Sequence, residues 1–67
     1  MMDTPRFKKG DTARTVHYLS PLPRGTTVAI VEVNETRQGI KYLIEGRVRG
    51  ESIQIWMKEK DLDRAFI

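Results

Sequence analysis

The stretch TTVAIVEVNETRQGIKYLIE, residues 26–45, decides the fold class of this chain. Its first part, residues 26–34, is rich in β-branched side chains, which favour strands. The part alternates clearly at its end, where Val31 and Val33 lie on the opposite side from Glu32. We therefore predict a half-buried strand over residues 26–34, apolar on both faces in its first half.

The second part of the stretch predicts another strand over residues 40–45. Ile40, Tyr42 and Ile44 share one face, while the residues between them, two of which are charged, take the other. The intervening ETRQG ends in a glycine, the residue that best tolerates the backbone angles of tight turns. We therefore expect a hairpin closed by Gly39.

A third strand is predicted over ESIQIWM, residues 51–57. Alternation sets Ile53, Ile55 and Met57 toward the core. The other side chains of the strand face outward: Ser52, Gln54 and Trp56. The glycine-bounded segment GRVRG, residues 46–50, predicts the turn before this strand.

Shorter elements surround this three-stranded meander. GDTARTV, residues 10–16, predicts a first strand, and HYLSPLPRG, residues 17–25, predicts a long loop because its prolines cannot join a sheet ladder. KEKDLD, residues 58–63, suits one 3₁₀ turn, and RAFI, residues 64–67, suits a last strand whose Phe66 covers the barrel end. The sequence therefore predicts an all-β fold, a small five-stranded SH3-like barrel with one 3₁₀ turn before the last strand.

Length and composition limit the function classes. A chain of 67 residues has room for one small core, so we expect a short N-terminal tail over residues 1–6 and one barrel domain over residues 7–67. The chain has no cysteine and a single histidine, His17, which argues against a metal site. Because the longest purely apolar run covers only residues 28–31, we expect no membrane span and a cytoplasmic location.

The charge balance is mildly basic. A net charge of +3 favours anionic partners such as a nucleic acid or a phosphorylated cofactor. The basic side chains form no polybasic arm, however, and acidic residues are mixed among them. This pattern favours a solvated surface of mixed charge over a nucleic-acid-binding stripe.

The outward side chains of the third strand are the most informative feature of the sequence. In one interpretation Trp56 packs under the loop that holds Pro21 and Pro23, and Gln54 is solvated. In the other, this face is a binding surface, because tryptophan offers stacking area and glutamine offers both a donor and an acceptor. The second interpretation predicts an oligomer or a planar ligand on this face.

Several motifs carry a resemblance to a known family. SIQIW at residues 52–56 resembles the Ser-Val-Gln-Ile-Tyr strand of the type II, plasmid-encoded, trimethoprim-resistant dihydrofolate reductases, which are small SH3-like barrels. FKKGDTAR at residues 7–14 is similar to that family's Phe-x-x-Gly-Asp-x-x-Arg opening. KYLIEG at residues 41–46 resembles its Tyr-Ala-Val-Glu strand, and DLDR at residues 61–64 resembles its Leu-Glu-Arg ending. The similarity covers most of residues 7–64.

This resemblance implies a homotetramer whose four barrels enclose one central pore, with NADPH bound from one side and dihydrofolate from the other. It makes Gln54, Ile55 and Trp56 the catalytic residues and adds Ser52 to them at the edge of the cofactor site. Gln54 is expected to hydrogen-bond either ligand, the Ile55 main chain to meet the nicotinamide carboxamide, and Trp56 to stand in place of a tyrosine. Reduction of dihydrofolate then depends on stacking and orientation of the two ligands, without a dedicated side-chain acid.

Three positions depart from the family's pattern. Thr15 stands where the family has a pore-mouth lysine that attracts the cofactor phosphate and the folate glutamate tail, and the nearby cationic candidates are Arg14 and His17. Trp56 is bulkier than tyrosine and lacks its hydroxyl. Arg49 stands in place of a histidine at the family's subunit contact.

Three functions therefore compete. The first is NADPH-dependent reduction of dihydrofolate in a shared pore. The second is a non-catalytic SH3-like module that binds a protein segment or a nucleic acid through Trp56, Tyr18 and the loop prolines. The third is a subunit of a larger machine without separate activity. An enzyme of this kind needs the strand around Gln54 to face a shared pore, whereas a peptide-binding module needs its aromatic residues beside the long loop.

Overall fold

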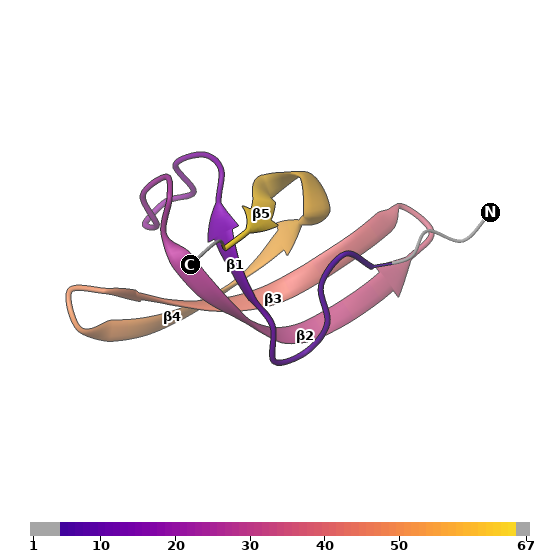
Figure 1. Ribbon diagram of the computed structural model, residues 1–67, viewed down its shortest axis with the longest axis horizontal. Coiled ribbons are helices and arrows are strands. Elements are labelled where there is room, and N and C mark those ends of the chain that lie inside the picture. Colours follow the sequence, from indigo (N-terminus) through magenta and orange to yellow (C-terminus); the bar gives the residue numbers. More distant parts are fainter. Residues whose placement is uncertain (1–4, 66–67) are drawn as a thin grey trace.

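The computed structural model describes residues 5–65, which form five antiparallel strands in one sheet. The elements in chain order are β1 Thr12–Thr15, β2 Thr27–Thr36, β3 Gly39–Val48, β4 Glu51–Lys58, the 3₁₀ turn η1 Glu59–Asp61, and β5 Leu62–Arg64. The strand order is β4-β3-β2-β1-β5, and Figure 1 shows β2, β3 and β4 as three long neighbouring strands with short β1 and β5 beyond them. Since β4 and β5 are unpaired edges, the sheet is not closed. The prediction of a small, partly open, SH3-like all-β fold with one 3₁₀ turn is confirmed.

The strand boundaries differ from the predicted ones at both hairpins. β2 continues to Thr36, and β3 continues to Val48, so the segment 46–50 is not a turn as a whole. The turn consists of Arg49 and Gly50, with φ angles of 53° and 82°. Two positive φ angles define the type I′ turn, whose twist matches that of a β-hairpin. The two-residue turn therefore lets the β3–β4 ladder run three residues further than predicted.

The last strand also starts earlier than predicted. β5 covers Leu62–Arg64, because its three residues pair with β1, beginning with Leu62 opposite Thr15. The expected 3₁₀ turn precedes it. The predicted cover of the barrel end by Phe66 lies outside the described residues. No helix within residues 5–65 has the length and hydrophobicity needed to cross a membrane.

β2 contains a bulge, so its side chains do not alternate regularly along the whole strand as predicted. The register passes from Ile30 opposite Ile44 directly to Glu32 opposite Leu43, so Val31 is the extra residue. Val28 and Ile30 are buried before the bulge, and Val33 is the half-buried inward residue after it. The one-residue shift explains why the inward apolar residues have even numbers before the bulge and odd numbers after it.

The core lies on one face of the sheet and includes a residue of the long loop. Its buried apolar residues are Phe7, Ala13, Leu22, Val28, Ile30, Ile40, Tyr42, Ile44, Met57 and Leu62. Leu22 belongs to the proline-bearing loop and is fully buried. A Cβ atom on Gly46 would meet Leu22 Cδ2 at 2.9 Å, so this close approach explains a glycine inside β3.

The Tyr42 hydroxyl joins the segment before β1 to η1. It accepts hydrogen bonds from the main-chain N–H of Arg6 (3.0 Å) and Phe7 (3.3 Å), and it donates to Glu59 Oε2 at 2.7 Å. The Phe7 ring packs edge-to-face on the Tyr42 ring at 5.4 Å. Burial raises the pKa of the Tyr42 phenol above its usual 10.0, and the bond to Glu59 raises it further. Arg6, within the expected tail, is thus attached to the barrel.

Candidate functional site

The candidate site is the outer face of strands β3 and β4, which is the face turned away from the core. Cross-strand register sets its residues in four opposed pairs, Arg47 with Ser52, Glu45 with Gln54, Leu43 with Trp56, and Lys41 with Lys58. The alternate residues of the same strands, such as Ile44 and Met57, are buried on the other face. The predicted outward placement of Ser52, Gln54 and Trp56 is confirmed, and these three side chains share one surface.

Gln54 lies at the middle of this face with its amide held by β3. Its Nε2 donates to Glu45 Oε1 at 3.2 Å. One amide N–H and the amide carbonyl remain for another partner, because a glutamine amide carries two donor hydrogens and an acceptor oxygen. Gln54 is exposed, so these groups are accessible to a ligand in the isolated chain.

Trp56 is not covered by the proline-bearing loop. Its side chain is 51% exposed, and it stands opposite the half-buried Leu43. The loop is anchored instead on the inner face, where Leu22 approaches Gly46. The interpretation that places Trp56 under the loop is therefore wrong. The indole offers a planar apolar surface, beside the apolar Leu43 of the neighbouring strand, on which a flat ring can stack.

Ile55 is separated from the other predicted site residues. Its side chain points inward and packs, half-buried, against the core. Its main chain is also directed to β3, because a type I′ turn closes on the hydrogen-bonded pair Val48–Glu51 and such pairs then recur at every second residue. Counting from that pair, Ile55 and Ile44 exchange main-chain hydrogen bonds.

The same alternation directs other main-chain groups of β4 outward. β4 is an edge strand. The N–H and C=O groups of four of its residues therefore point away from β3, in the plane of the sheet and toward its free edge: Ser52, Gln54, Trp56 and Lys58. The contact of Lys58 agrees with this direction, since its N–H donates to Asp61 Oδ2 in η1 at 3.2 Å. Gln54 and Trp56 therefore present both a side chain and main-chain groups to a partner, a role that the resemblance assigned to Ile55.

Thr15, at the family's pore-mouth lysine, is part of the interior. It is 2% exposed, and its Oγ1 donates to the Pro23 carbonyl at 2.8 Å and accepts from the Thr26 N–H at 3.0 Å. The side chain of a lysine introduced at this position would start inside the core and not at the mouth of a pore. Of the nearby cationic candidates, His17 has its Nε2 3.1 Å from Asp61 Oδ1, and Arg14 borders a hollow that includes neither Gln54 nor Trp56.

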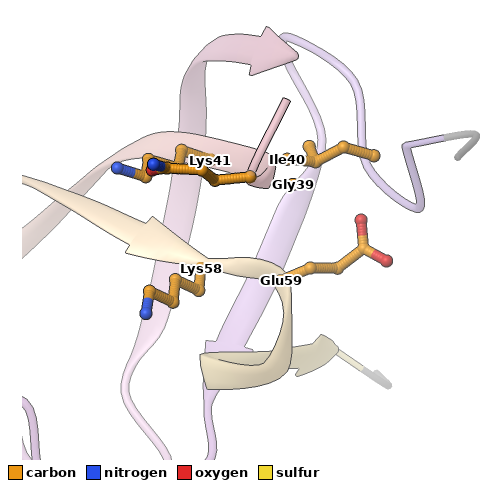
Figure 2. A pocket seen from close by; sticks show the side chains of 6 residues that line it. Gly39, Ile40, Lys41, Lys58 and Glu59 are labelled. Atoms are coloured by element: carbon orange, nitrogen blue, oxygen red, sulfur yellow. The ribbon is translucent and has the colours of Figure 1, made fainter. Parts of the chain in front are cut away.

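Three hollows on the described surface lie outside residues 52–56. One of about 400 Å³ surrounds Arg14 and Arg24, and one of about 470 Å³ lies between Phe7 and Val33. The third, of about 220 Å³, adjoins the outer face at Lys41 and Lys58 (Figure 2). None of these three includes Gln54 or Trp56, and the exposure of both side chains shows that they are open to solvent in one chain.

Sequence reasoning missed the contribution of β3 to this face. Leu43, Glu45 and Arg47 stand opposite the three predicted residues, and Lys41 stands opposite Lys58. The alternation of residues 40–45 already places Lys41, Leu43 and Glu45 on one face. Their cross-strand partners could be assigned only once the length of the second turn was known, because turn length sets hairpin register.

No known protein family matches this chain, and neither the curated proteins nor the solved structures contain a significant match to it.

Proposed function

We propose that this protein is a cytoplasmic, NADPH-dependent dihydrofolate reductase of the trimethoprim-insensitive type II kind, which acts as a homotetramer with one shared pore. The observation that carries the proposal is that the side chains of Gln54 and Trp56 are both exposed on the outer face of an edge strand. This placement is what a pore wall requires, and it matches the order of residues in the family's Ser-Val-Gln-Ile-Tyr strand.

The residues of this face suit two flat, polar ligands. Trp56 supplies a stacking surface, and Gln54 supplies a hydrogen-bond donor and acceptor that are not used by Glu45. NADPH supplies the hydride that reduces a C=N bond of the pterin, and one proton is taken up from solvent. The protein's contribution is to hold the two rings in contact and to exclude other orientations, which can remove several kcal/mol of the barrier.

The resemblance implies a contact between the Ile55 main chain and the nicotinamide carboxamide, and this proposal assigns that contact to other residues. The outward main-chain groups belong to Gln54 and Trp56, so these groups would bind the nicotinamide carboxamide. Ser52 remains at the edge of the site, opposite Arg47. Ile55 then acts as a core residue that fixes the position of its two neighbours.

Assembly is a requirement of the proposal. A ligand site of this size normally encloses about 300–1,000 Å³, and the face around Trp56 is open in one chain. Facing copies can close it, and each copy then adds a Gln54 and a Trp56 to one site. Light scattering should therefore give about four times the 7.8 kDa chain mass at neutral pH. A strict monomer at high concentration would contradict the shared pore.

The activity test is oxidation of NADPH in the presence of dihydrofolate, with and without trimethoprim. We expect NADPH consumption that requires dihydrofolate and continues at trimethoprim concentrations that stop an ordinary, sensitive reductase assayed in parallel. The sensitive enzyme serves as the positive control for both the substrate and the inhibitor. Absence of dihydrofolate-dependent turnover by a folded tetramer would contradict the proposal.

The non-catalytic module remains the second candidate, because Tyr18 in the long loop is 65% exposed. Its predicted aromatic surface combines Tyr18 with Trp56 beside the loop. The loop is anchored on the inner face through Leu22 and Gly46, whereas Trp56 is on the outer face. This separation favours the reductase, and binding without turnover would favour the module.

A further inference from the structure

Two lysines face one another at one end of the outer face. Lys41 on β3 and Lys58 on β4 are directly opposed, so their Cβ atoms are about 4.5–5.5 Å apart. Like charges in this arrangement destabilise a sheet. Asn34 on β2 stands opposite Lys41 and completes a row across three strands without an acidic residue.

The acidic residues nearest to this pair are engaged elsewhere. Glu59 borders the same hollow, but its Oε2 accepts from the Tyr42 hydroxyl, and Figure 2 shows the Glu59 side chain pointing away from both lysines. Asp61 accepts from the Lys58 main chain and lies beside His17. Among residues 5–65 the ion pairs are Arg6–Asp63 and His17–Asp61, so neither lysine ammonium is paired there.

Two further acidic residues lie on the same face. Glu32 is in the neighbouring row, opposite Leu43, and Glu45 receives the Gln54 amide. Neither forms an ion pair with Lys41 or Lys58 within the described residues. The two positive charges therefore remain uncompensated by the fold.

The surroundings of the pair fit a phosphate group. The lysines border a hollow of about 220 Å³, and Figure 2 shows their side chains extending in the same direction. Trp56 is two residues from Lys58 along β4, a distance of about 7 Å. A phosphate monoester carries about two negative charges at neutral pH, which matches two ammonium groups. A ring stacked on Trp56 can thus carry a phosphate to this pair.

We propose that Lys41 and Lys58 form the phosphate subsite of a nucleotide whose ring stacks on Trp56. The inference rests on the proposed function, in which the nucleotide is NADPH, the stacked ring is its adenine and the group is its 2′-phosphate. The nicotinamide then lies at the Gln54–Trp56 surface of another copy in the tetramer. Thr15 is uncharged and buried, so it cannot bind the cofactor phosphate as the family's pore-mouth lysine does. In this proposal Lys41 and Lys58 bind that phosphate at a different place in the fold. The subsite makes the protein prefer NADPH to NADH, which lacks the 2′-phosphate.

The test compares three nucleotides on three proteins. NADPH, NADH and adenosine 2′,5′-bisphosphate are titrated into the wild-type protein, into Lys41→Gln/Lys58→Gln, and into Lys8→Gln/Lys9→Gln. The last variant removes the same charge from the segment before β1. Fluorescence of Trp56, the single tryptophan, and calorimetry report binding. Thermal unfolding should show that the Lys41→Gln/Lys58→Gln variant is no less stable, because it relieves a like-charge pair.

We expect the wild-type protein to bind NADPH about tenfold or more tightly than NADH, and to bind the bisphosphate. The Lys41→Gln/Lys58→Gln variant should lose both properties, and the Lys8→Gln/Lys9→Gln variant should keep both. Retention of the preference in the first variant, equal loss in both variants, or absence of nucleotide binding to the wild-type protein would overturn the subsite. Lysine-dependent bisphosphate binding by a protein that does not reduce dihydrofolate would support the subsite and reject the reductase.

Discussion

The two faces of strands β3 and β4 differ in what their side chains do, although they alternate along the same ten and eight residues. The inner face is buried, with Tyr42 and Ile44 fully enclosed and no unsatisfied buried side-chain polar atom among the described residues. The outer face exposes Trp56 and opposes two lysines without a counter-ion. The inner face therefore stabilises the fold, and the outer face is left for a partner.

The largest loss of stability is expected at Ile44, the centre of the inner face. Ile44→Ala should lower the free energy of unfolding by about 2–5 kcal/mol, because it removes buried methyl groups and leaves a cavity. A fold of this length holds roughly 3–10 kcal/mol, so much of the variant should be unfolded under mild denaturant. Arg47→Ala, on the outer face of the same strand, should change stability by less than about 0.5 kcal/mol. Equal urea midpoints for the two variants would contradict the claim that the inner face contributes more to stability than the outer face.

Tyr42→Phe should cost less, about 1–3 kcal/mol. It keeps the ring contact with Phe7 but removes the hydroxyl that joins Arg6 and Phe7 to Glu59. Denaturation in urea measures the loss, and amide hydrogen exchange should show faster exchange at Phe7. Tyr18→Phe, at an exposed tyrosine, is the matched control and should leave both measurements unchanged.

Gly46→Ala should cost about 1 kcal/mol. The added methyl group would meet Leu22 Cδ2 at 2.9 Å, and Leu22 is fully buried in close-packed surroundings. The cost stays at the low end of the overpacking range because the end of the Leu22 side chain can rotate. A double variant with Leu22→Val, which makes room for the methyl group, should show less than the sum of the two single losses. Strict additivity would show that Gly46 is not constrained by this contact.

Ionisation of Tyr42, on the inner face, should lower the free energy of unfolding at alkaline pH. Burial and then Glu59 raise the pKa of Tyr42 in the folded state above 10.0. Its contribution is therefore fully present below pH 10 and declines as the pH rises through the folded-state pKa. The stability difference between wild type and Tyr42→Phe should narrow above about pH 10 in urea titrations. A difference that stays constant to higher pH would contradict the raised pKa.

Alternation allowed the two faces to be predicted from sequence because it is a local property of strands. The inward set around Ile44 and the outward set around Gln54 follow from a period of two residues. The bulge at Val31 and the short turn at Arg49 could not be foreseen in the same way, since each depends on how neighbouring strands pair. The turn in particular decides which main-chain groups of β4 face outward, and so it moved that role from Ile55 to Gln54 and Trp56.

Long-range contacts account for the other differences. Thr15 gave no signal of burial, because its hydrogen-bond partners lie in the irregular loop at Pro23 and Thr26. The link from Tyr42 to Arg6 spans 36 positions, and no local pattern encodes it. The opposition of Lys41 and Lys58 is a further example, since it depends on the register of the complete hairpin.

Dihydrofolate-dependent NADPH oxidation by Gln54→Ala, with thermal unfolding recorded on the same samples, tests whether the outer face binds the ligands. Gln54 is exposed and bonded only to Glu45 among the described residues, so its loss should change stability by less than about 0.5 kcal/mol. Activity should fall to background, because four amides are removed from one shared site. Thr12→Ala, at an exposed residue of β1, should retain both stability and activity. Unchanged turnover by a folded Gln54→Ala protein would contradict the assignment of the outer face as the ligand-binding surface.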